Sequence, residues 1–275
     1  MKQERVAIIP ARNESKGIAK VLNSLSRHVD HVIVVDDGSE DSTGAIARGM
    51  GAEVIRIDAS GVGAATVTGL ESAKHRVPAA IVTLDADGQH DPNWIEAGLQ
   101  TLAGKNVDVV FADRFQELEG VPLTKQISNN IAWAFVRQML KRVPVTRDVS
   151  CGFRIYGPRG LSQVLGLENA RTRGYAFVQS SYVWLCDTNL QCKSISVPAV
   201  YPIHQGTPMP ELRQFLQWAA NEGPPDEVVR ELSTIIDGAT NARFALTSWL
   251  PPHVKQEIMA IREGDQVVFR FETTG

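Results

Sequence analysis

Short, mostly apolar runs alternate with amphipathic stretches along the first half of the chain. Each run is free of glycine and stops at, or directly before, a proline or an aspartate. The runs lie at residues 6–10, 31–35, 53–58, 79–84 and 107–112. Runs of this length and composition predict strands that are buried on both faces of a parallel sheet.

Amphipathic stretches fill the gaps between these runs. Ile18, Val21, Leu22 and Leu25 recur at helical spacing after the first run. Residues 39–43 offer small oxygen-bearing side chains to the N-terminus of the next helix. Strands that alternate with helices predict an α/β fold, with a mostly parallel central sheet flanked by helices.

Acidic residues stand at the ends of three consecutive predicted strands. Asp36 and Asp37 follow the second run, Asp58 closes the third, and Asp85 follows the fourth. The carboxyl ends of parallel strands share one edge of the sheet, and open α/β sheets bind their ligands there. Stacked negative charge brings no structural benefit. The pattern therefore predicts a site for a metal ion and a polar ligand.

Residues 85–90 carry the strongest chemical signal in the chain. Asp85 and Asp87 are separated by one residue, directly after a buried strand. Their hard carboxylate oxygens suit Mg²⁺ or Mn²⁺, which commonly share their coordination sphere with substrate phosphates. The alternative is a polar turn in which Asp91 caps the next helix.

Three segments together resemble the signature of family 2 glycosyltransferases, which have the GT-A fold. They are residues 10–14, 34–39 and 85–90. The similarity is to the branch of dolichol-phosphate mannose synthases and polyprenyl-phosphate glycosyltransferases, and it covers residues 5–205. It implies inverting transfer of a sugar from a UDP- or GDP-sugar to an acceptor, with a polyprenyl phosphate as the leading expectation. An unrelated nucleotide-binding sheet, the alternative, would more typically carry Gly-x-Gly-x-x-Gly after its first strand, and this chain lacks that motif.

The resemblance also assigns the donor and metal residues. It implies a Mg²⁺ or Mn²⁺ ion held by Asp85, Asp87 and Gln89, which would neutralise the diphosphate as it leaves. Asp87 is therefore expected to be catalytic. The nucleotide sugar is expected to contact Pro10, Arg12, Asn13, Glu14, Asp36, Asp37, Asp58, Gly63, Asp85 and Ala86.

Residues 148–154 resemble the Asp-x-x-Ser-Gly-Phe-Arg segment of the same branch, and Asp148 is expected to be catalytic. It would act as a general base toward a hydroxyl acceptor, or as an orienting carboxylate for a phosphate acceptor, which is already ionised. A turn residue bonded to its own backbone is the alternative. Arg114 is also expected to take part in catalysis, near the acceptor phosphate or the diphosphate. The acceptor is expected to contact Arg114, Lys125, Ser128, Asn129 and His204.

The chain departs from the family pattern on the acceptor side. Ser180 and Ser196 stand where the branch carries glutamates, Val62 replaces a lysine, and His204 lies where an arginine-containing loop is usual. These losses leave the donor residues intact but weaken the case for a polyprenyl phosphate. A soluble acceptor (a small molecule, a protein or a modified nucleic-acid base) stays open, as does a catalytically silent sugar-nucleotide-binding subunit. A nucleotidyltransferase is disfavoured because no Gly-rich triphosphate loop follows the first strand.

Composition bounds the remaining possibilities. A chain of 275 residues can hold a large domain and an appendage. We expect a GT-A domain at 1–208 and a mainly helical extension at 209–275.

A net charge of −3 gives no global attraction to nucleic acid or to an anionic membrane. The chain shows no secretory signal and no apolar run of membrane-spanning length, so we expect a cytoplasmic protein. Peripheral membrane contact and homodimerisation stay open.

Overall fold

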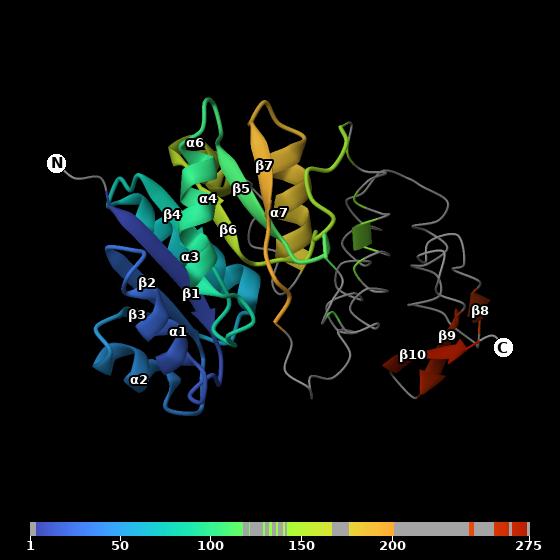
Figure 1. Ribbon diagram of the computed structural model, residues 1–275. Coiled ribbons are helices and arrows are strands. Elements are labelled where there is room, and N and C mark those ends of the chain that lie inside the picture. The colour runs from blue at the N-terminus through green and yellow to red at the C-terminus, as the bar shows by residue number, and fades with distance from the viewer. Residues whose placement is uncertain are drawn as a thin grey trace.

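The computed structural model describes most of the first 200 residues and three strands near the C-terminus (Figure 1). The described residues are 4–117, 121, 129, 132, 133, 136, 140, 142–166 and 176–200, together with the backbone of 242–244, 256–263 and 266–273.

A seven-stranded sheet forms the centre of the fold, with the strand order β3-β2-β1-β4-β6-β5-β7. Its strands are β1 (Arg5–Ala11), β2 (His31–Asp37), β3 (Glu53–Ile57), β4 (Ala80–Thr83), β5 (Val109–Asp113), β6 (Arg154–Tyr156) and β7 (Cys192–Ser196). β1 pairs in parallel with β2 and β4, and β2 pairs in parallel with β3. The predicted mostly parallel α/β sheet is confirmed.

β6 is the one inverted strand of this sheet. It runs antiparallel to both of its neighbours, β4 and β5. An antiparallel strand begins at the edge where its parallel neighbours end. Residues 148–153, which lead into β6, are therefore delivered to the same edge as the residues that follow β4 and β5.

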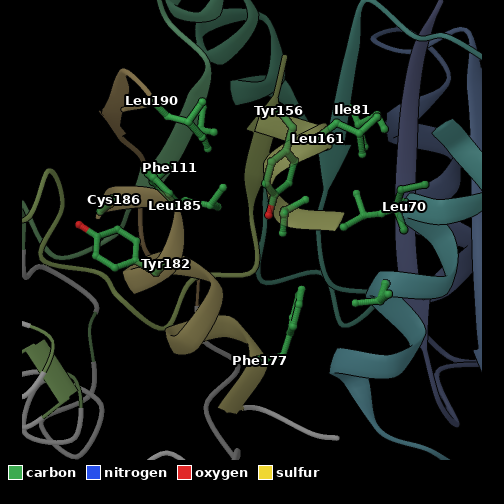
Figure 2. Packing of buried hydrophobic residues seen from close by; sticks show 14 of the residues in the cluster. Leu70, Ile81, Phe111, Tyr156, Leu161, Phe177, Tyr182, Leu185, Cys186 and Leu190 are labelled. Carbon is green, nitrogen blue, oxygen red and sulfur yellow. The ribbon is translucent and has the colours of Figure 1, made fainter. Parts of the chain in front are cut away.

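Helices cover both faces of the sheet (Figure 1). They are α1 (Ile18–Leu25), α2 (Thr43–Gly49), α3 (Val62–Lys74), the 3-10 helix η1 (Pro92–Trp94), α4 (Ile95–Leu102), α6 (Pro158–Leu165) and α7 (Ala176–Cys186). The side chains of β1 alternate between the two layers. Val6 and Ile8 belong to the hydrophobic cluster that also contains side chains of α3, α6 and α7, whereas Ala7 and Ile9 belong to the cluster that contains side chains of α1 and α4. Figure 2 shows part of the first cluster. Burial on both faces explains the unbroken apolar runs in the sequence.

The first strand continues past the point at which the sequence predicted its end. β1 includes Pro10 and ends at Ala11, and Pro10 lies opposite Val35 of β2. On its other side, the last β1–β4 pair is Ile8 with Thr83. Pro10 thus lies beyond the end of β4, where no ladder bond requires an amide hydrogen.

The C-terminal region contains a three-stranded antiparallel sheet. Its strands are β8 (Ala242–Phe244), β9 (Gln256–Glu263) and β10 (Gln266–Thr273). The extension, which the sequence predicted to be mainly helical, therefore contains three strands among its described residues. The helices expected elsewhere in 209–275 lie outside the described residues, and the division at residue 208 stays a prediction. No helix among the described residues is long and apolar enough to cross a membrane.

Candidate active site

A pocket of about 290 Å³ lies at the carboxyl ends of β1, β2 and β4, the edge where the sequence predicted a ligand site. The pocket brings together most of the residues predicted to bind the donor and the metal. These are Pro10, Arg12, Glu14, Asp37, Asp85, Ala86 and Asp87. Ala11, Gly61, Val62 and Ala65 complete the lining.

Asp37 lines the pocket and also supports the turn that forms one of its walls. Its Oδ1 and Oδ2 accept hydrogen bonds from the backbone N–H groups of Ser60 and Gly61, at 2.7 and 2.9 Å. The carboxylate therefore fixes the turn that precedes α3 and lines one wall of the pocket.

Asp36 does not line the pocket, because successive strand side chains point to opposite faces. It is 1% exposed, accepts from the Ser39 N–H at 2.8 Å and pairs with Arg56 Nη1 at 2.7 Å. Burial raises the pKa of Asp36, but the Ser39 hydrogen bond and the Arg56 charge outweigh it, so this pKa lies below its ordinary value. Asp36 anchors the turn after β2. Asp58 and Gly63 likewise do not line the pocket.

The loop after β1 presents Glu14 to the pocket. Asn13 has a left-handed backbone with φ 57°, a conformation that asparagine tolerates better than most residues. Its N–H donates to Ser39 Oγ at 3.0 Å, and its Oδ1 accepts from the Glu40 N–H at 2.8 Å. The Glu14 N–H donates to Thr43 Oγ1 at 2.7 Å. Asn13 thus ties this loop to the turn after β2. Ser39 and Thr43, which the sequence offered to the N-terminus of α2, accept from this loop instead.

Four carboxylates line the pocket, and three of them, Glu14, Asp85 and Asp87, repel one another. Burial and the charges of Asp87 and Asp85 raise the pKa of Glu14. Burial, followed by the charge of Asp85, raises the pKa of Asp87. Like charges held together in a half-buried site favour a bound cation or a proton. This electrostatic strain fits a site that is completed by a divalent metal.

Gln89 supports Asp87 in the structure. Its backbone N–H donates to Asp87 Oδ1 at 2.9 Å, and its side-chain Nε2 donates to Oδ2 at 2.7 Å. No group of three or more His, Cys, Asp or Glu side chains among the described residues makes a ready-formed metal site. Mg²⁺ usually takes only one or two carboxylates from a protein and completes its coordination with phosphate oxygens and water.

Arg114 and Asp148 form a buried, two-pronged ion pair. Arg114 Nε lies 2.6 Å from Asp148 Oδ2, and Nη2 lies 3.2 Å from Oδ1. Ser150 Oγ also donates to Oδ1, at 3.1 Å. Arg114 is 7% exposed and Asp148 is 2% exposed. The charge of Arg114 also opposes the rise in the Asp87 pKa, so the pair lies close to the carboxylates of the pocket.

Asn129 belongs to the same network. It is buried, and its Nδ2 donates to the backbone carbonyl of Arg147 at 2.7 Å, which ties it to the segment that carries Asp148. The other residues predicted to contact the acceptor, Lys125, Ser128 and His204, lie outside the described residues.

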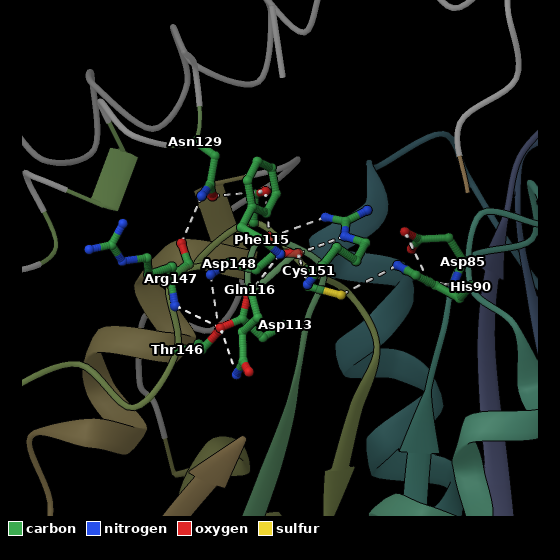
Figure 3. Close-up of polar contacts among 12 residues, drawn as sticks. Asp85, His90, Asp113, Phe115, Gln116, Asn129, Thr146, Arg147, Asp148 and Cys151 are labelled. Carbon is green, nitrogen blue, oxygen red and sulfur yellow. Dashed lines mark hydrogen bonds and ion pairs between the residues drawn. The ribbon is translucent and has the colours of Figure 1, made fainter. Parts of the chain in front are cut away.

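His90 is a buried residue to which the sequence gave no role. It lies at the end of the 85–90 segment, 3% exposed, between Asp85 and Cys151 (Figure 3). Burial lowers the pKa of His90 to about 4, and the charge of Arg114 adds to this effect. The ring is therefore neutral at physiological pH. Its position in the same segment as Asp85 and Asp87 was the available signal.

Tyr182 holds the backbone that leads to Asp148. Its hydroxyl accepts from the N–H groups of Val145 and Thr146, at 3.0 and 3.3 Å. We expect Tyr182→Phe to lower the free energy of unfolding by about 1–3 kcal/mol, because it leaves buried donors unpaired. Urea denaturation would measure the loss. Tyr156→Phe is the control, because Tyr156 is also a buried tyrosine and its hydroxyl makes no hydrogen bond to the described residues. Equal losses in both variants would contradict the prediction.

A mostly parallel sheet with a carboxylate-lined pocket at its carboxyl edge is the arrangement of an α/β enzyme that binds a nucleotide. The chain belongs to glycosyl transferase family 2, whose model matches residues 6–165, and it is a glycosyltransferase. A UDP-N-acetylglucosamine–dolichyl-phosphate N-acetylglucosaminyltransferase of Methanococcus voltae is 32% identical over 216 residues, which cover 70% of this chain and 84% of the relative.

Solved structures show the same fold. Mannosyl-3-phosphoglycerate synthase from Rubrobacter xylanophilus matches with a TM-score of 0.61 at 16% identity, covering 99% of this chain and 87% of its own. Glucosyl-3-phosphoglycerate synthase from Mycobacterium tuberculosis, in complex with Mn²⁺, UDP-glucose and phosphoglyceric acid, matches with a TM-score of 0.58 at 18% identity. This match covers 90% of this chain and 85% of the other. The GT-A fold implied by the resemblance is confirmed.

Proposed function

We propose that this protein transfers a sugar, with inversion and with the help of Mg²⁺ or Mn²⁺, from a UDP- or GDP-sugar to a phosphate-bearing acceptor. A polyprenyl phosphate is the leading acceptor. The observation that carries the proposal is the convergence of Glu14, Asp85 and Asp87 in one pocket, with the buried Arg114 close by. The name of the Methanococcus relative, which contains both a UDP-sugar and dolichyl phosphate, supports it.

The residues divide into a donor side and an acceptor side. Asp85 and Asp87 would hold the divalent cation, which neutralises the charge on the departing diphosphate. The acceptor oxygen attacks the anomeric carbon as the bond from that carbon to the diphosphate breaks, and the nucleoside diphosphate leaves. An ionised phosphate acceptor needs no base. Asp148, which is held by Arg114, would then orient the arginine toward the acceptor or the diphosphate.

Titration calorimetry with UDP and with GDP tests the donor side of the proposal. Each nucleotide is titrated once in Mn²⁺ and once in a chelator. We expect one of them to bind in Mn²⁺ and to bind much more weakly in the chelator, because the diphosphate would otherwise face the carboxylates of the pocket without a cation. Equal affinity in both buffers would refute metal dependence, and failure of both nucleotides to bind would refute the donor assignment.

A soluble phosphorylated acceptor is the second candidate. Ser180 replaces a glutamate that is usual in the polyprenyl-phosphate branch, and the matched phosphoglycerate synthase structure aligns with 99% of this chain. Transfer of a labelled sugar to 3-phosphoglycerate in buffer, and to a polyprenyl phosphate in detergent, separates the two candidates. Hydrolysis of the donor without transfer to either would point to another soluble acceptor, whereas no turnover at all would point to a silent binding subunit.

Gly152 offers a direct test of the Asp85 position. A Cβ built at Gly152 would lie 2.8 Å from Asp85 Oδ1 and 3.2 Å from Oδ2. Gly152→Ala should therefore displace this carboxylate and lower metal affinity or activity about 10- to 100-fold, the usual effect of disturbing a ligand's support. Mn²⁺ titration of UDP binding would measure it. Gly49→Ala, where a Cβ meets nothing within 4 Å, is the control, and equal behaviour of the two variants would contradict the prediction.

A further inference from the structure

His90 joins two segments that meet beside the pocket. One is the 85–90 segment after β4, and the other is the 148–153 segment before β6. The His90 side chain is 1% exposed, and its ring lies against Phe153 with ring centroids 5.9 Å apart. A polar ring buried this deeply needs partners for both of its nitrogens.

The contacts of His90 define which nitrogen carries the proton. Nδ1 accepts a hydrogen bond from the Asp85 backbone N–H at 3.1 Å. A nitrogen that accepts carries no hydrogen, so the ring proton lies on Nε2. Nε2 lies 3.5 Å from the sulfur of Cys151, which is 2% exposed. The neutral ring thus accepts from one segment and donates to the other (Figure 3).

The surroundings of Asp85 leave its carboxylate few positions. His90 holds its backbone N–H, and the carboxylate packs against Gly152, where even a methyl group would not fit. Thr83 Oγ1 donates to the Gly152 carbonyl at 2.7 Å. This hydrogen bond holds the 148–153 segment at the end of β4. His90 Nδ1 lies 3.6 Å from Asp85 Oδ2, so the carboxylate lies beside the ring without a hydrogen bond to it.

We propose that His90 is a positioning residue for the transfer reaction, because it sets the direction of the Asp85 carboxylate and, through Cys151, ties the metal-binding segment to the acceptor-side segment. The inference rests on the proposed function, in which Asp85 is a metal ligand. In this role, His90 must accept a hydrogen bond at Nδ1 and donate one at Nε2.

A pair of substitutions separates these two contacts. His90→Leu removes both, whereas His90→Asn retains an acceptor near the position of Nδ1 and loses the donor to Cys151. We expect His90→Leu to raise the Mn²⁺ concentration that half-saturates UDP binding about 10- to 100-fold, as loss of a ligand's support does. His90→Asn should stay closer to the unchanged protein in this titration and lose mainly turnover. Cys151→Ala should behave like His90→Asn.

A histidine outside the site provides the matched control. His31 lies at the start of β2 and bonds to Glu53 at 2.8 Å. His31→Leu should leave the Mn²⁺ titration unchanged. If His90→Leu lowered only the melting temperature and left the titration at its normal value, His90 would be an ordinary core residue and the inference would be overturned. Equal weakening of metal binding by His90→Leu and His90→Asn would overturn the acceptor role of Nδ1.

Histidine ¹⁵N spectra of the unaltered protein test the same inference, and a variant is needed only to assign the signal. We expect one histidine of the folded protein to carry its proton on Nε2 and to accept a hydrogen bond at Nδ1. The signals of this histidine are assigned to His90 if they disappear in His90→Asn. The opposite tautomer would overturn the inference even if His90→Leu did not fold. Measurements on the unaltered protein also separate failure of the proposed function from failure of the inference about His90. Equal UDP binding in Mn²⁺ and in chelator refutes the metal step of the proposed function, whereas normal metal dependence in both His90 variants refutes only the inference.

Discussion

Asp87→Asn is expected to lower turnover about 10²- to 10³-fold, the cost of losing a group that stabilises charge in the transition state, while the fold is retained. Asparagine has nearly the shape of aspartate, but it lacks the negative charge that would hold a divalent cation beside the diphosphate. Its oxygen can still accept from the Gln89 backbone N–H, which donates to Asp87 Oδ1 at 2.9 Å. The Gln89 side-chain amide can turn to offer its oxygen to the new Nδ2.

The same substitution should stabilise the metal-free protein at neutral pH. Burial and the charge of Asp85 raise the pKa of Asp87, which means that the folded state disfavours its ionised form. Above this raised pKa the charge costs stability, and asparagine removes that cost. As the pH falls through the pKa, Asp87 becomes protonated in the unaltered protein and the advantage of the variant disappears.

Turnover, Mn²⁺ titration and thermal melting in chelator together check this prediction. Asp91→Asn is the control, because the Asp91 side chain accepts from the Asn93 N–H at the start of η1 and does not line the pocket. It should retain turnover. A parallel fall in melting temperature and turnover in Asp87→Asn would mean that Asp87 is structural.

Local patterns predicted the elements that are buried on two faces or on one regular stripe. The helix expected around Ile18 and Leu25 is α1, with these residues at its ends. The runs at 31–35 and 79–84 are β2 and β4. These predictions succeeded because burial of a strand or a helix face is recorded in the spacing of neighbouring residues.

The orientation of side chains at the strand ends was less fully predicted. Asp36 and Asp37 were both expected at the donor, yet strand alternation sends only Asp37 to the pocket and leaves Asp36 paired with Arg56. The period of two in a strand could have separated them. The family resemblance matches Asp36 and Asp37 as one motif, so it did not separate the positions of the two side chains.

Contacts across the inverted strand had no signal in the sequence. Arg114 and Asp148 are 34 positions apart, and His90 and Cys151 are 61 positions apart. Both pairs form because β6 inserts antiparallel between β4 and β5. β6 is only three residues long, too short for a periodic pattern. The order of strands in a sheet depends on packing among distant segments, which no local spacing records.

Asp148→Asn is expected to abolish transfer while binding of the donor and the metal survives. Both oxygens of Asp148 face Arg114, and an asparagine would set an N–H group against one prong of the guanidinium. Arg114 would lose the two-point contact that fixes its plane. Asp148 does not line the donor pocket, so calorimetric binding of UDP or GDP with Mn²⁺ should change little. Collapse of donor binding together with activity would show that Asp148 supports the donor site.

A comparison with Arg114→Met decides whether Asp148 acts through the arginine or as a base. If Asp148 only orients Arg114, then Asp148→Asn, Arg114→Met and the double variant should lose turnover to the same extent, because residues that act as a unit are not additive. If Asp148 removes a proton from a hydroxyl acceptor, Asp148→Asn should be far less active than Arg114→Met. Breaking a buried ion pair on one side costs about 3–5 kcal/mol of stability, so each variant is first checked for folding by thermal melting. We expect equal losses, because the buried carboxylate has both oxygens engaged by Arg114 and an ionised phosphate acceptor requires no base.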